Sequence, residues 1–330
     1  MHAWLCEQTT GVQDLQWKSL PMPEPGPGQV RVAIQAASLN FPDLLIVQGK
    51  YQMKPALPFV PGAEFAGVVE ACGEEVHHLQ PGDAVACLQG TGGFATHVLA
   101  QAALCMPLPK GFPAQDAAAF IMTYATSHHA LVDRAQLKAG ETVLILGAAG
   151  GVGTAAIQIA KAVGARVIAA ASTADKCATC LQLGADATLN YSEHTPSGSL
   201  RDEIKRLTDG KGPDVVYDPV GGELAEPVFR SIAWRGRYLV VGFASSPAIP
   251  QLPMNLPLLK GASLVGVFWG EFARREPKAN AAMMAELASW YAQGKVKPLI
   301  HQALPMADLK QAYATMGSRG VQGKLVLVND

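Results

Sequence analysis

The chain has 330 residues, of which 49% are hydrophobic and 16% are charged, and its formal net charge is -1. This length favours two domains with large cores, and the near-zero charge, without a Lys/Arg-dense stripe, disfavours nucleic-acid binding. The N-terminus does not resemble a signal peptide, and no apolar stretch approaches the roughly 20 residues of a membrane helix. We therefore expect no membrane span and a cytoplasmic location.

The first third of the chain predicts strands at 29–37, 64–72 and 84–87, separated by short Gly/Pro-rich turns. Such frequent punctuation is typical of a compact antiparallel barrel or sandwich.

From about residue 114 the apolar period changes, first to a helical stretch over 126–134 and then to strands that alternate with helices. The expected strands are 142–147, 165–171, 187–191, 214–218, 237–243 and 263–269, and the expected helices are 152–163, 174–183, 199–207 and 222–232. Strands joined by helical crossovers predict a doubly wound parallel sheet. The sixth strand should lie at the sheet edge, where its apolar residues favour pairing with a second copy.

The C-terminal tail predicts a helix at 277–293, a short extended piece at 298–300, a helix at 306–316 and a strand at 324–328. It is too small to fold alone, so we expect it to rejoin the N-terminal domain.

Six cysteines are scattered along the chain, which favours reduced thiols. Cys177 and Cys180 form a close pair within a helical pattern. Ordinary helix residues are the favoured interpretation, with a redox pair and a metal site as alternatives.

The strongest chemical signal is a glycine-rich turn between the strand at 142–147 and the next helix. Gly150 leaves room for backbone amides to approach a pyrophosphate, while Gly153 allows close packing of the helix on the strand. Gly151 and Val152 belong to the same turn. Ala148 replaces the first glycine of the usual fingerprint, so the turn must differ slightly from it. A dinucleotide is the expected ligand.

The second strand of this fold ends in Ser172, where proteins that prefer NAD place a carboxylate for the ribose 2′-hydroxyl. Ser172 can donate a hydrogen bond to a 2′-phosphate, and Lys176 can supply charge one helical turn later. NADPH is therefore favoured, although Lys176 on a solvated helix face is an alternative. Asp175 is explained by the dipole of the helix that it begins.

Five further motifs carry a resemblance along essentially the whole chain. They are Ala37–Asp43, Pro61–Val69, Pro81–Asp83, Leu183–Asp186 and Asp218–Gly222. With the glycine-rich turn, they resemble the zinc-free medium-chain dehydrogenases/reductases, in particular the NADPH:quinone oxidoreductase (zeta-crystallin-like) branch. The resemblance implies an α/β fold, with a GroES-like β-rich catalytic domain at 1–123 and 263–330, a Rossmann domain at 124–262 and an active cleft between them.

The resemblance also bears on metal binding. Zinc-dependent relatives have a catalytic Cys where this chain has Asn40 and a His where it has Ala63, and neither replacement ligates zinc well. The structural-zinc lobe is missing between Cys87 and Cys105. We therefore expect no metal.

The resemblance further assigns site residues. It places Asn40 and Thr126 near the nicotinamide, Tyr191 beside the adenosine phosphate, Gly242 and Phe243 along the cofactor, and Phe268 and Lys324 in the cleft. Asn40, Tyr51 and Thr126 are the catalytic candidates, with Tyr51 as a proton donor. Cap or turn roles for Asn40 and Thr126, and surface packing for Tyr51, are the alternatives.

The expected activity is hydride transfer from NADPH to a quinone or similar conjugated acceptor, in a homodimer formed through the edge strand 262–270. Two alternatives stay open at this point. One is reduction of an enoyl or acrylyl double bond, including that of a CoA thioester, and the other is NADPH binding without catalysis.

Overall fold

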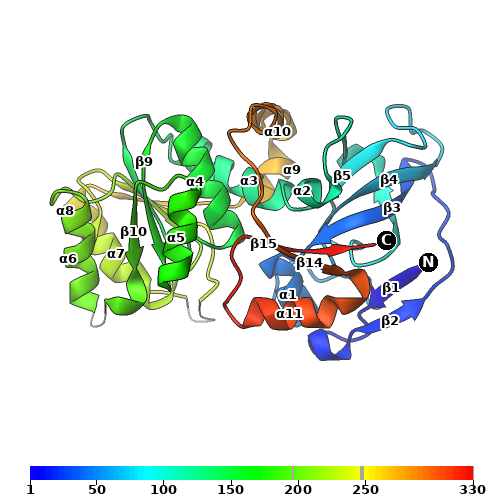
Figure 1. Ribbon diagram of the computed structural model, residues 1–330, viewed down its shortest axis with the longest axis horizontal. Helices are drawn as coiled ribbons and strands as arrows, with labels where there is room; N and C mark the ends of the chain where they lie inside the picture. The colour runs from blue at the N-terminus through cyan, green and yellow to red at the C-terminus, as the bar shows by residue number, and fades with distance from the viewer. Residues whose placement is uncertain (195–196, 246–248, 330) are drawn as a thin grey trace. The chain divides into compact units, whose positions relative to one another are not determined.

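The computed structural model describes residues 1–194, 197–245 and 249–329. The chain divides into two compact units, Met1–Met122 with Ile300–Asp330, and Thr123–Leu299. Both chain ends therefore lie in the first unit (Figure 1). None of the helices that the structure describes is long and apolar enough to cross a membrane.

The first unit is rich in strands, as its Gly/Pro punctuation predicts. Its elements are β1 (His2–Leu5), η1 (Val12–Asp14), β2 (Gln16–Ser19), β3 (Gln29–Ser38), α1 (Phe41–Val47), β4 (Glu64–Cys72), β5 (Ala84–Leu88), β6 (His97–Gln101), η2 (Ala102–Leu104), β7 (Cys105–Pro107), α2 (Ala114–Ala118), β14 (Ile300–Pro305), η6 (Met306–Asp308), α11 (Leu309–Gly317) and β15 (Lys324–Val328). A seven-stranded sheet runs in the order β14-β15-β3-β4-β5-β7, with β6 also paired to β3. Its pairs are antiparallel except β14 with β15.

The second unit contains a six-stranded sheet whose described pairs are all parallel. Its elements are η3 (His129–Arg134), β8 (Thr142–Ile145), α4 (Gly151–Val163), β9 (Arg166–Ala171), α5 (Ala174–Gln182), β10 (Ala187–Asn190), η4 (Tyr191–Glu193), α6 (Ser197–Leu207), β11 (Val215–Asp218), η5 (Gly222–Leu224), α7 (Ala225–Ser231), β12 (Arg237–Val240), α8 (Asn255–Lys260), β13 (Ser263–Gly266), α9 (Trp269–Arg275) and α10 (Pro277–Ala292). The order β10-β9-β8-β11-β12-β13 confirms the doubly wound sheet and places β13 at its edge. Helix α3 (Ile121–His128) crosses the boundary between the units.

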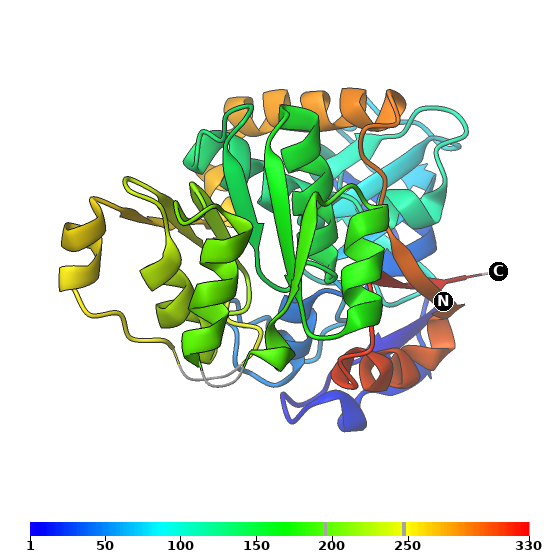
Figure 2. The same ribbon diagram turned by 60° about the vertical axis from the view of Figure 1, so that its left-hand side comes forward.

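Helices cover both faces of the sheet in the second unit. Because parallel crossovers are right-handed, the direction in which the chain moves along the sheet decides which face each helix covers. The chain moves outward from β8 to β10 and then returns to β11, so α4 and α5 cover one face and α6 and α7 the other. Figure 2 shows the green and yellow strands of this sheet with helices packed along them. The strands meet a continuous apolar core, which explains their near-continuous apolar sequences.

Three expectations need correction. Residues 263–299 lie with the second unit rather than with the GroES-like unit, because β13 continues the parallel sheet by pairing with β12. Strands β12 and β13 end at Val240 and Gly266, before their predicted ends. Helix α9 was not expected; it ends before Pro277, which disfavours helical backbone in the residue that precedes it.

Candidate active site

The glycine-rich turn lies where β8 meets α4. Gly147 has a φ of 57°, and Gly150 is the residue that caps α4. A Cβ atom on Gly153 would lie 2.4 Å from the carbonyl oxygen of Gly147, so only glycine permits this approach of helix and turn. The interpretation of Gly153 as a packing glycine is confirmed. With Gly151 and Val152, it forms the first turn of α4, a helix N-terminus of the kind that favours anions.

Four polar residues lie at the carboxyl end of β9. Lys176 Nζ donates to Ser172 Oγ at 3.4 Å, and Ser192 Oγ donates to the carbonyl oxygen of Ser172 at 3.0 Å. Tyr191 stands next to Ser192 in η4, which follows β10, the parallel neighbour of β9. The pairing of these strands thus brings Ser172, Lys176 and Tyr191 to one edge of the sheet.

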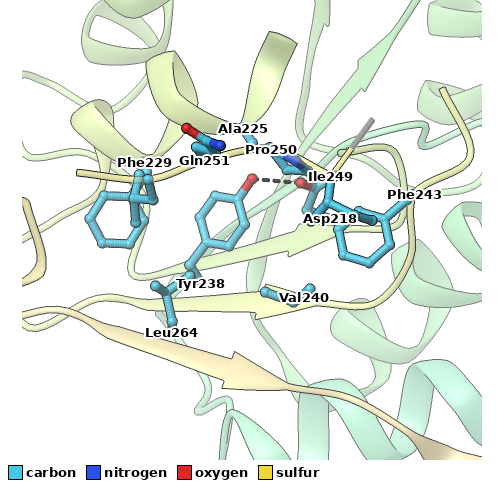
Figure 3. A pocket seen from close by; sticks show the side chains of 11 residues that line it. Asp218, Ala225, Phe229, Tyr238, Val240, Phe243, Ile249, Pro250, Gln251 and Leu264 are labelled. Atoms are coloured by element: carbon cyan, nitrogen blue, oxygen red, sulfur yellow. Dashed lines mark hydrogen bonds between the residues drawn. The ribbon is translucent and has the colours of Figure 1, made fainter. Parts of the chain in front are cut away.

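A second glycine-containing turn follows β11 and is held by one carboxylate. Asp218 Oδ1 accepts hydrogen bonds from the backbone N–H groups of Val220 and Gly221, both at 2.8 Å. Asp218 Oδ2 accepts one from Tyr238 Oη at 2.6 Å (Figure 3). A Cβ atom on Gly147 would lie 2.8 Å from Val220 Cγ2, so this turn packs directly on the glycine-rich one.

The Asp218–Tyr238 bond lies in a cavity of about 220 Å³ on the second unit (Figure 3). Its lining is mostly apolar and comprises Asp218, Ala225, Phe229, Tyr238, Val240, Phe243, Ile249, Pro250, Gln251, Leu252 and Leu264. Burial raises the pKa values of both Asp218 and Tyr238, and the Asp218 charge raises that of Tyr238 further. The tyrosine therefore remains a hydrogen-bond donor at neutral pH.

Replacing Tyr238 with phenylalanine is expected to lower the free energy of unfolding by about 1–3 kcal/mol, because a buried carboxylate oxygen loses its donor. Urea unfolding at neutral pH measures this loss. Tyr313→Phe is the matched control, because the buried Tyr313 hydroxyl has no hydrogen-bond partner among the described residues, and it should unfold like the wild-type protein. Equal stability of Tyr238→Phe and wild type would contradict the assigned bond.

The other site residues predicted for the second unit differ in their position and in their exposure to solvent. Gly242 and Phe243 follow β12, and Phe243 packs against Gly221, where a Cβ atom would lie 2.8 Å from its ring. Phe268 precedes α9 and is exposed, whereas Thr126 lies on α3 and is half-buried. Gly242 and Phe243 thus adjoin the turn that Asp218 holds.

The first unit contains a buried polar cluster around Asn40. Lys324 Nζ donates to Asn40 Oδ1 at 2.6 Å and to the carbonyl oxygen of Leu39 at 2.8 Å. Asn40 Nδ2 donates to Glu64 Oε2 at 3.0 Å, and Ser38 Oγ donates to the same oxygen at 2.9 Å. All these side chains are buried. The cluster therefore fixes the Asn40 amide through both of its polar atoms.

Two carboxylates at this cluster also accept hydrogen bonds from backbone N–H groups, as is expected for carboxylates beside turns and strands. Glu64 Oε1 accepts a hydrogen bond from the N–H of Met122, and Asp43 accepts from the N–H groups of Asn40 and Ala63, each at 2.9 Å. Burial raises the pKa of Asp43 to about 7, against the lowering effect of these bonds and of Lys324. Burial lowers the pKa of Lys324, while the Glu64 and Asp43 charges oppose that shift.

The raised pKa of Asp43 predicts a pH dependence. Folded protein holds this proton up to about pH 7, whereas the unfolded chain releases it near the usual carboxyl pKa of about 4. The contribution of Asp43 to the free energy of unfolding therefore falls as the pH rises from about 4 to about 7. Urea unfolding should show that Asp43→Asn destabilises the protein less at pH of about 8 than at about 5. A stability difference that is independent of pH would contradict this assignment.

Tyr51 is partly buried and packs against the apolar core of the first unit. Burial raises the pKa of its hydroxyl, and the Asp43 charge raises it further. Its hydroxyl therefore stays protonated at neutral pH, as a proton donor must.

Several residues of these sites escaped the sequence analysis. Ser38, Ser192 and Tyr238 each bond a residue that the sequence singles out. Ser38 lies within the Ala37–Asp43 motif but received no role, and Ser192 and Tyr238 lie outside every motif. Within the described ranges, no three His, Cys, Asp or Glu side chains are placed to hold a metal ion.

Comparisons with known proteins agree with this architecture. Residues 26–110 match the alcohol dehydrogenase GroES-like domain family, and residues 151–288 match the zinc-binding dehydrogenase family. A quinone oxidoreductase-like protein 2 homolog of Nematostella vectensis is 38% identical over 92% of this chain and 82% of its own. The quinone oxidoreductase of Pseudomonas aeruginosa is 36% identical over 96% of each chain.

Solved structures are similar over almost the whole chain. The quinone oxidoreductase of Thermus thermophilus, also solved in complex with NADPH, has a TM-score of 0.86 and 32% identity, and the match covers 100% of both chains. The CurK enoyl reductase has a TM-score of 0.87 and 27% identity over 99% of each chain.

Proposed function

Because the chain belongs to the quinone oxidoreductase family of the medium-chain dehydrogenase/reductase superfamily, we propose that it reduces a quinone or similar conjugated acceptor with NADPH and without a metal. The observation that carries the choice of cofactor is the contact between Lys176 and Ser172 at the end of β9. This pair offers a cation and a hydroxyl to a 2′-phosphate, at the place where a carboxylate would repel it.

The residues of the second unit fit a dinucleotide. The close approach at Gly153 leaves no Cβ atom between the glycine-rich turn and α4, so the N–H groups of Gly151 and Val152 can bind a pyrophosphate. Ser172, Lys176 and Tyr191 would bind the adenosine end. Thr126, Gly242, Phe243 and Phe268 are proposed to contact the rest of the cofactor.

NADPH supplies a hydride when bound, and the protein supplies position and the exclusion of water. Lys324 and Glu64 hold the Asn40 amide in one orientation, which we assign to positioning at the nicotinamide end. Lys324 also brings a positive charge to this cluster, which supports chemistry without a metal ion. Tyr51 or water is the proposed proton source for the reduced acceptor.

A conjugated enoyl compound, such as a CoA thioester, is the second candidate acceptor. The similarity to an enoyl reductase structure supports it. Both acceptor classes present an electrophile to the same hydride.

The free state of all six thiols supports a reducing compartment such as the cytoplasm.

The test is NADPH oxidation by the metal-stripped protein, followed by absorbance with a panel of quinones, enones and enoyl-CoA thioesters, and with NADH in parallel. Turnover with quinones and a preference for NADPH would support the proposal. Turnover with enoyl compounds alone would favour the second candidate. Tight NADPH binding without turnover across the panel would indicate a non-catalytic binding protein.

We also propose a homodimer formed through the edge strand of the second unit. Among the strands that the structure describes, β13 pairs with β12 alone, and Leu264 on it and Phe268 after it are exposed. Light scattering at micromolar concentration should give the mass of a dimer, and Leu264→Lys should shift it toward a monomer. Leu104→Lys, at an equally exposed leucine of the first unit, is the control. A monomer mass for the wild-type protein would exclude this assembly.

A further inference from the structure

Cys87 and Cys105 face each other across two neighbouring strands of the first unit. Cys87 on β5 is the direct register partner of Cys105 on β7. Both side chains are buried. The fold thus places two free thiols side by side although 17 residues separate them in sequence.

The hydrogen-bond pattern shows which kind of pair they form. The N–H of Leu108 bonds the carbonyl oxygen of Ala84, so β5 and β7 exchange hydrogen bonds at Ala84 and at every second residue from it. Cys87 and Cys105 therefore form a non-hydrogen-bonded pair of the antiparallel ladder. Val85 and Pro107 form another pair of this kind, which agrees with the lack of a backbone N–H in proline.

This kind of pair meets the distance requirement of a disulfide. Residues opposite each other without backbone hydrogen bonds have Cα atoms about 4.5 Å apart, and their side chains are the closest in the ladder. Disulfides span Cα separations of about 4.4–6.8 Å. A bond between Cys87 and Cys105 therefore needs rotation of the thiols and little movement of the backbone.

The position of β7 provides access for a small reagent. It is a three-residue strand at the edge of the sheet, with β5 as its neighbour, and it follows the exposed Leu104. Short edge strands open at low free-energy cost, because few contacts hold them. Local opening of β7 therefore exposes Cys105 while the rest of the unit stays folded.

We propose that Cys87 and Cys105 are a redox site, in which a peroxide converts the two thiols into a reversible disulfide that joins β7 to β5. The Cys105 sulfur attacks a peroxide oxygen, the O–O bond breaks, and a sulfenic acid and water form. The Cys87 sulfur then attacks the sulfenic sulfur, forming the S–S bond and releasing a second water. The two thiols lose two electrons and two protons, and one hydrogen peroxide gains them.

The order of attack follows from the positions of the two strands. Cys87 lies on β5, which is paired with β4 on one side and β7 on the other, whereas Cys105 lies on the edge strand that opens. Cys105 is therefore the attacking residue, and Cys87 is the resolving one.

The test treats the reduced full-length protein with a small excess of hydrogen peroxide, blocks the remaining thiols with iodoacetamide under denaturing conditions, and maps peptides without reduction by mass spectrometry. We expect a linked peptide that contains Cys87 and Cys105 and that dithiothreitol abolishes. Full alkylation of both residues, with oxidation confined to other cysteines such as the more exposed Cys72, would overturn the proposal.

Two variants test the assigned roles. Cys87→Ala should lose the linked peptide and accumulate a sulfenic acid at Cys105, detected by dimedone labelling, because the resolving thiol is gone. Cys72→Ala is the matched control and should keep the linked peptide. If Cys87→Ala instead labels at other cysteines and not at Cys105, the order of attack is wrong. The wild-type peptide map decides the proposal even if a variant fails to fold.

Discussion

Replacing Lys324 with methionine is expected to lower the free energy of unfolding by about 3–5 kcal/mol, because it leaves a buried carboxylate without its cation. Lys324 Nζ lies 3.9 Å from Glu64 Oε2 and also holds Asn40 and the carbonyl oxygen of Leu39. Methionine fills similar volume, so the loss measures the charge and its hydrogen bonds rather than a cavity. Urea unfolding with a two-state fit of the first unit measures the effect.

The second half of this experiment removes the opposite charge. Glu64→Gln in the Lys324→Met background should recover part of the lost stability, since no uncompensated carboxylate remains at that position. Additive losses in the double variant would show that Lys324 and Glu64 do not compensate each other. The same variants should also lose NADPH oxidation if the cluster positions Asn40 at the nicotinamide end.

Lys176→Ala is expected to weaken NADPH binding by about 1–3 kcal/mol, or roughly 5- to 150-fold in Kd, while the affinity for NADH stays unchanged. The reason is that only NADPH carries the 2′-phosphate that the ammonium of Lys176, next to Ser172, would contact. Fluorescence titration of both cofactors measures the two Kd values at fixed ionic strength, because such charge contacts weaken with salt.

Lys278→Ala provides the control for Lys176, since it removes an exposed lysine from the first turn of α10. It should leave both affinities unchanged. Equal losses of NADPH and NADH affinity in Lys176→Ala would show that the lysine does not read the 2′-phosphate. Unchanged affinities for both would place Lys176 outside the site.

The sequence predicts the second unit well because local patterns determine it. Each parallel strand is a short apolar run followed by a helix, and Gly153 stands where a Cβ atom would collide with Gly147. The position of Ser172 relative to Lys176 also follows locally, because a strand end and the first turn of the next helix are adjacent in sequence.

Long-range contacts were not predictable in the same way. Lys324 bonds Asn40 across 284 positions, and no local pattern connects them. The bond between Tyr238 and Asp218 joins two neighbouring parallel strands, and its register is fixed only when the sheet forms. The domain boundary before residue 263, which the resemblance implied, separated the predicted parallel sheet from its own sixth strand, and the pairing of β13 with β12 places that strand in the second unit.

The position of β15 between β14 and β3 has a consequence for how the protein is made. During synthesis, residues 123–299 leave the ribosome before the last two strands, so the parallel sheet can form first. The first unit cannot close its sheet until residues 300–328 have also been made. Until Lys324 emerges, Glu64 lacks its cation, so the polar cluster around Asn40 can form only after the whole parallel sheet has been synthesised.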